Sequence, residues 1–140
     1  PPPIALAAFA AATLTKADPM ATGFVAMKFG WTAYFVPFLF VFSPTLLLFG
    51  DPANVVIDIA TVVVGTYYGS IAVVGYFARP LNPLLRVLLG ASGVAAMLPH
   101  TLFENAPFVI GVGVVLGLII IVYEYSFARR TKRAAAPEMP

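Results

Sequence analysis

The sequence has no cysteine, a single histidine and few charges. Of its 140 residues only 10% are charged and 61% are hydrophobic, and the mean hydropathy is +0.95. The absence of cysteine excludes a disulfide framework, a thiolate metal site and a cysteine nucleophile. A single histidine, His100, excludes a paired-histidine zinc motif. What is present is far more apolar than a soluble domain, so the sequence predicts a membrane protein.

Motifs for several classes of function are also missing. The chain has no phosphate-binding glycine loop, no nucleophile elbow and no basic, aromatic surface for nucleic acid. It also lacks the cluster of polar residues that a membrane-embedded enzyme would need. We therefore expect no catalytic residues, no cofactor of enzymatic type and no nucleic-acid partner.

Five uncharged runs divide the chain, and four of them have the length of a membrane span. A bilayer core requires about 20 apolar residues per helix, and these four runs cover residues 29–50, 59–78, 87–103 and 105–123. The run at 1–15 is short for a crossing and opens with prolines, which donate no backbone hydrogen bond, so it fits a half-helix. The predicted fold is all-α: a polytopic integral membrane protein in which the N-terminal half-helix of a discontinuous helix precedes four transmembrane helices.

The basic residues predict how these spans are oriented. Lys and Arg collect on the cytoplasmic side of a membrane. The links at 50–54 and 99–104 have none, whereas every basic residue lies in an alternate link: Lys16, Lys28, Arg79, Arg86, Arg129, Arg130, Lys132 and Arg133. This predicts a multi-pass protein with a cytoplasmic C-terminus and, because the links are short, antiparallel neighbouring helices. Residues 134–140 have no periodic pattern and are predicted to be a disordered cytoplasmic tail.

A few polar residues and small-residue pairs remain to be interpreted. Asp58 lies about one turn inside the second span, where a carboxylate is either functional or placed at the interface or against another helix. Glu124 is interpreted as an interfacial residue near the basic cluster. His100 lies in an outer link with Glu104, where its ring is able to titrate, whereas metal binding requires several converging ligands and the sequence has no second histidine. The GxxxG spacings at 65–69 and 113–117 predict close helix packing.

The most informative segment is the proline run Pro1, Pro2 and Pro3 with Ile4. Prolines leave upstream carbonyls unpaired, and such backbone is tolerated at membrane depth only inside protein or at a cavity. Free carbonyls are ligands for Na⁺, and the start of the following half-helix favours an anionic group. The alternative is a loop leading into an ordinary helix. Because the chain opens on these prolines rather than on Met, we expect it to continue a longer upstream sequence.

Three stretches resemble the C-terminal part of the large membrane subunit of TRAP transporters: residues 2–12, 17–23 and 36–48. The nearest type is the fused permease that works with TAXI-class binding proteins. The resemblance assigns residues 1–50 to the end of the permease transport domain. Residues 51–133 resemble the additional three-helix membrane domain of such permeases, chiefly by layout and by the segment 76–81.

The resemblance implies secondary active transport of an organic acid with Na⁺, delivered by a periplasmic TAXI-type binding protein, in the bacterial inner membrane. It places Pro2, Pro3 and Ile4, with the adjoining Pro1, at the helix break near a sodium site, where backbone rather than side chains would bind. Pro1 stands where the family usually has Thr, so a side-chain contribution there is lost, and Ala5 replaces a frequent Gly. The competing hypothesis is a structural or accessory module that packs against another permease subunit.

Overall fold

A computed structural model describes the backbone of residues 5–134 and the side chains of residues 5–130. Within this part of the chain the fold is helical and has no strand, apart from an isolated bridge between Tyr76 and Pro80. This confirms the predicted all-α class. The chain divides between Phe38 and Leu39 into two compact units.

The first unit contains two short helices that pack against each other, α1 (Leu6–Thr15) and α2 (Pro19–Phe29). Lys16 ends α1 in the left-handed conformation, at φ 56°. Asp18 then starts α2, because its carboxylate accepts a 2.6 Å hydrogen bond from the Ala21 amide and Pro19 takes the first helical position. With ten residues, α1 is about 15 Å long, half of a bilayer core.

Helix α3 (Trp31–Phe42) follows α2 after a break at Gly30, with a bend of 42° between the two helices. Pro37 lies inside α3. The other proline of this run, Pro44, lies after the end of α3. The α-helix stops at Phe42, and Pro44 begins a short 3₁₀ helix, η1 (Pro44–Leu47). The predicted helical span to residue 50 is therefore too long at its C-terminal end, because a proline cannot continue the α-helical hydrogen bonds.

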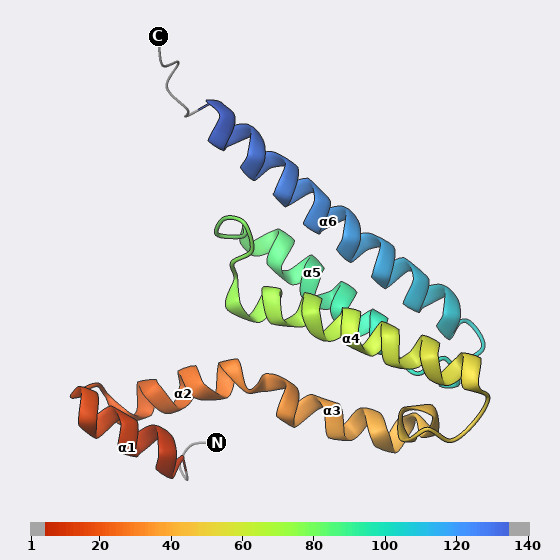
Figure 1. The fold of residues 1–140 in the computed structure, drawn as a ribbon, viewed down its shortest axis with the longest axis horizontal. Helices are drawn as coiled ribbons and strands as arrows, with labels where there is room; N and C mark the ends of the chain where they lie inside the picture. Colours follow the sequence, from red (N-terminus) through yellow and green to blue (C-terminus); the bar gives the residue numbers. More distant parts are fainter. Residues whose placement is uncertain (1–4, 135–140) are drawn as a thin grey trace. The chain divides into compact units, whose positions relative to one another are not determined.

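The second unit is built on three longer helices, α4 (Pro52–Val74), α5 (Pro83–Ala96) and α6 (Ala106–Ala134). Helix α5 packs along both of the others, and α4 and α6 meet over a smaller area. Figure 1 shows that the chain reverses direction between α4 and α5 and again between α5 and α6. The prediction of antiparallel neighbours is confirmed for these three helices.

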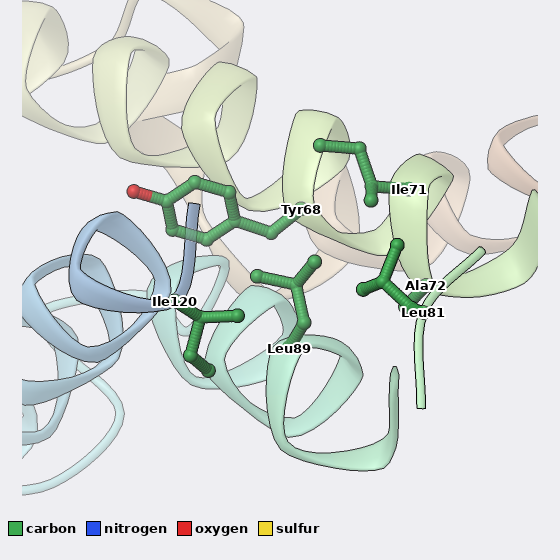
Figure 2. Close-up of a cluster of buried hydrophobic side chains, with 6 residues drawn as sticks. All are labelled: Tyr68, Ile71, Ala72, Leu81, Leu89 and Ile120. Atoms are coloured by element: carbon green, nitrogen blue, oxygen red, sulfur yellow. The ribbon is translucent and has the colours of Figure 1, made fainter. Parts of the chain in front are cut away.

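Figure 2 shows the apolar core of this unit, which combines side chains from all three helices and from the link that precedes α5. Leu89 of α5 is fully buried at its centre, beside Tyr68 of α4 and Ile120 of α6. The Tyr68 hydroxyl donates a 3.1 Å hydrogen bond to the Val114 carbonyl of α6. The buried Tyr68 hydroxyl therefore has a hydrogen-bond partner within the protein.

Small residues set the separation of these helices. A Cβ atom added to Gly65 would lie 2.6 Å from the Gly93 carbonyl oxygen, and one on Gly113 would lie 2.9 Å from the Ser92 carbonyl oxygen. At Gly117 the added carbon would overlap the ring of Tyr68. The GxxxG prediction of close helix packing is confirmed at Gly65, Gly113 and Gly117.

Two helices are long and apolar enough to cross a membrane, α4 and residues 106–130 of α6, and there are three if the bent pair α2 and α3 counts as one span. Helix α5, with 14 residues, falls short of that length because it ends at Ala96 and the chain turns through residues 97–105. The structure thus supports a helical protein with two or three potential membrane spans. The predicted tail beyond Ala134 lies outside the described residues.

Candidate functional site

The proline segment that the sequence singled out, Pro1 to Ile4, lies outside the described residues. The description begins at Ala5, which precedes α1 in a non-helical conformation with φ −97° and ψ 62°. The proposed backbone ligands for Na⁺ therefore stay a prediction. Among the described residues no group of three or more acidic or histidine side chains is arranged to hold a metal ion.

The structure instead brings together four polar side chains around Asp58, which we call the Asp58 cluster: Ser43, Thr45, Asp58 and His100. Helix α4 begins at Asp51, whose carboxylate accepts a hydrogen bond from the Ala53 amide at 3.1 Å. Two helical turns later Asp58 lies on the same face of α4. Its side chain is only 3% exposed, so an uncompensated charge there would be costly in lipid or protein.

Two hydroxyls approach Asp58 from the segment before α4. The turn that starts η1 places Ser43 and Thr45 on either side of Pro44, with their hydroxyl oxygens 2.8 Å apart. The Ser43 hydroxyl donates to Asp58 Oδ2 at 3.1 Å, and the Thr45 hydroxyl also donates to this oxygen. Both residues are buried. The break after α3 thus supplies hydrogen-bond donors that a continuous helix would not bring to this point.

His100 reaches the same carboxylate from the link between α5 and α6. Its Nδ1 lies 2.8 Å from Oδ1 and 2.9 Å from Oδ2 of Asp58. The His100 side chain is 23% exposed, so its ring lies between the buried carboxylate and the surface. The sequence marked Asp58 and His100 as separate candidates. Only the fold shows that they form one site.

The order of groups in the Asp58 cluster limits what it does chemically. In a nucleophilic triad the imidazole lies between the hydroxyl and the carboxylate, so that it removes the hydroxyl proton. Here the carboxylate lies between the hydroxyls and the imidazole. This arrangement joins three segments of the chain and differs from a Ser-His-Asp triad.

A second polar contact lies at the opposite end of the three-helix unit. Arg79, in the link between α4 and α5, donates to Glu124 of α6 through Nε at 2.5 Å and a terminal nitrogen at 2.9 Å. The Arg79 guanidinium also lies 4.0 Å from the ring centre of Phe127. The hydrogen bond to Glu124 raises the pKa of Arg79 above its ordinary value. Glu124 is buried rather than interfacial, and its partner comes from a distant link, whereas Arg129 lies over the ring of Tyr125.

Arg86 of α5 completes this end of the unit. Helix α4 ends at Gly75, which adopts φ 78°, and its last turn leaves carbonyls without helical partners. The Arg86 guanidinium donates to the Ala72 carbonyl at 2.5 Å and to the Val73 carbonyl at 2.7 Å. Arg79 and Arg86, which the sequence pattern marked only as topology signals, thus also connect neighbouring helices.

No family model, curated protein or solved structure matches this chain.

Proposed function

We propose that this chain is the C-terminal part of a TRAP-type permease that imports an organic acid together with Na⁺ by alternating access. The observation that carries the proposal is α1, an apolar helix of ten residues that starts directly after the proline segment. Such a helix covers about half of a bilayer core. In secondary transporters, half-helices of this kind end at substrate and ion sites near the middle of the membrane.

The arrangement after α1 adds support. Lys16 and Lys28 lie at the ends of the segment that contains α2, and the bent pair α2 and α3 is close to the length of one span. We assign four crossings to the protein in its membrane: α2 with α3, α4, α5 with the residues that follow it, and α6. In this assignment the Asp58 cluster lies at the outer side and the C-terminal end of α6 in the cytoplasm.

In this function, Pro1, Pro2, Pro3 and Ile4 offer backbone carbonyls to Na⁺, and the start of α1 offers amide groups to the organic acid. A periplasmic binding protein of the TAXI class delivers the substrate, and the protein resides in the bacterial inner membrane. No covalent chemistry is involved. Specificity is set largely by the upstream part of the permease and by the binding protein.

Uptake by the reconstituted full-length permease tests this proposal. We expect Pro3→Ala to reduce Na⁺-dependent uptake, because an added backbone donor closes the helix break. Pro107→Ala is the matched control, since Pro107 is exposed in the first turn of α6. Unchanged sodium dependence in Pro3→Ala would contradict the proposed site. A start codon immediately before Pro1 in the genome would contradict the permease assignment as a whole.

A second function, an accessory module that packs against another permease subunit, is favoured by one observation. Helices α4, α5 and α6 have their own core and their own interhelical ion pair between Arg79 and Glu124. Deleting the residues after Gly50 from the full-length permease separates the two functions. Loss of uptake with normal membrane insertion favours a transport role for the three helices, and normal uptake with loss of subunit association favours the accessory role.

A further inference from the structure

A small hollow lies on one face of α6, near the C-terminal end of the helix. It is lined by Tyr123, Ser126, Phe127 and Arg130, and its volume is about 150 Å³. These residues are spaced by three and four positions, so they share one face of the helix. We call this hollow the α6 pocket. It combines a guanidinium, two hydroxyls and two aromatic rings.

The α6 pocket has an uncompensated positive charge. Arg79 is paired with Glu124, Arg86 caps α4, and Arg129 donates to the Tyr125 hydroxyl at 2.5 Å while its guanidinium lies over that ring. Within the part of the chain that the structure describes, Arg130 has no carboxylate or carbonyl partner. An anion is therefore the complementary ligand.

Below the α6 pocket, toward the middle of the helix, the same face is apolar. Ile119 is 58% exposed and Val115 is 56% exposed, and their positions continue the spacing of Tyr123 and Ser126. The stretch from Arg130 back to Ile119 rises about 16 Å, which is about half of a bilayer's hydrocarbon thickness. This face of α6 thus has a positively charged end with hydrogen-bond donors. Next to that end lies an apolar surface about as long as the hydrocarbon part of one leaflet is thick.

We propose that the α6 pocket binds the headgroup of an anionic phospholipid, in the leaflet where the C-terminal end of α6 lies. Arg130 donates its forked hydrogen bonds to the phosphate, and the hydroxyls of Ser126 and Tyr123 donate to the remaining oxygens. One acyl chain follows the apolar face past Ile119. A free phosphate satisfies the same donors but leaves this face uncovered, so the lipid is the better fit. The site is independent of the proposed transport function.

Native mass spectrometry of the purified chain in detergent tests the site with phosphatidylglycerol as the probe and phosphatidylcholine as the neutral comparison. We expect phosphatidylglycerol to bind more tightly. Arg130→Gln should weaken that binding about tenfold or more, because it removes a charge-assisted contact with phosphate. Arg129→Gln is the matched control, as it removes the same charge one residue away, where the side chain lies on Tyr125.

Three results would overturn the proposal. Equal losses in Arg130→Gln and Arg129→Gln would show a general electrostatic attraction without a site. Equal binding of the two lipids would remove the preference for an anion. Displacement of phosphatidylglycerol by millimolar inorganic phosphate would show an anion site that does not need the lipid chain.

A milder variant guards against loss of folding. Ser126→Ala removes one donor at an exposed position of α6 and favours the helix. We expect it to weaken phosphatidylglycerol binding severalfold while the circular dichroism spectrum and melting temperature stay unchanged. Full-strength binding in this variant would overturn the assigned role of the hydroxyl.

Discussion

Asp58 and His100 lie 42 residues apart in the sequence, yet His100 Nδ1 is 2.8 Å from a carboxylate oxygen of Asp58. This contact ties the link between α5 and α6 to the first part of α4. The Ser43 hydroxyl, 3.1 Å from the same carboxylate, adds the segment before α4. The segment before α4, the first part of α4 and the link between α5 and α6 thus meet at one buried carboxylate.

Removing His100 should destabilise the protein. His100→Ala leaves one side of a buried carboxylate without its partner, and we expect a loss of about 1–3 kcal/mol in the free energy of unfolding. A double-mutant cycle with Asp58→Asn, followed by unfolding in mixed micelles, measures the coupling. Glu104→Gln is the control, because Glu104 is an exposed acid in the same link. Additive effects of His100→Ala and Asp58→Asn would contradict the contact.

The pair Arg79 and Glu124 should depend on geometry as well as charge. Arg79→Lys keeps the charge but loses the forked double hydrogen bond, so its melting temperature should fall between those of the wild type and Arg79→Gln. If Arg79→Lys is as stable as the wild type, the forked geometry contributes nothing.

The stabilisation by Arg79 should also be insensitive to alkaline pH. Its pKa in the folded protein is raised above the ordinary arginine value by the Glu124 hydrogen bond. The stabilisation is therefore fully present below the unfolded-state pKa and is lost only as the pH rises through the folded-state value. We expect the stability difference between the wild type and Arg79→Gln to be constant from about pH 7 to about pH 10. A decline within this window would show that another group controls the contact.

Two glycines of α6 provide a matched test of helix packing. Gly117 faces the ring of Tyr68, whereas a Cβ atom at Gly111 would meet nothing within 4 Å. Gly117→Ala should cost about 1–3 kcal/mol through overpacking. Gly111→Ala should be neutral or stabilising by up to about 1 kcal/mol, because alanine favours a helix. Equal thermal stability of the two variants would argue against the packing of α4 against α6.

The absence of cysteine makes the proposed orientation directly testable. Single-cysteine variants Ala53→Cys and Thr101→Cys place a thiol in links predicted to lie outside, and Lys28→Cys and Lys132→Cys place one inside. A membrane-impermeant maleimide applied to intact cells should label only the first two. Labelling of Lys132→Cys would contradict the cytoplasmic C-terminus.

The sequence alone was sufficient to predict the helical class and the membrane character, because both follow from composition and from the lengths of uncharged runs. It also predicted where α6 begins, because the uncharged run at 105–123 starts one residue before this helix. Helix α4, by contrast, begins at Pro52, ahead of the run at 59–78, because Asp51 and Pro52 start the helix before its uncharged part. The GxxxG spacings identified glycines at helix contacts, since only the smallest residue permits such an approach.

The span at 87–103 was predicted less well. Its apolar run continues past Ala96, but the helix does not. Hydropathy reflects burial or lipid contact and does not distinguish a helix from an apolar turn. The apolar residues after Ala96 therefore did not indicate that the helix ends there. The predicted span at 29–50 was also too long, because the α-helix ends at Phe42 and Pro44 begins a 3₁₀ helix.

By itself the sequence determined that the chain is apolar, helical and able to cross a membrane, because these properties depend on which residues follow one another. Only the tertiary structure decided that Asp58 meets His100 and that Glu124 meets Arg79. Polar contacts between distant segments depend on helix direction, rotation and link geometry. Local hydrophobic periodicity specifies none of these three properties, and each is set only when the three helices pack against one another.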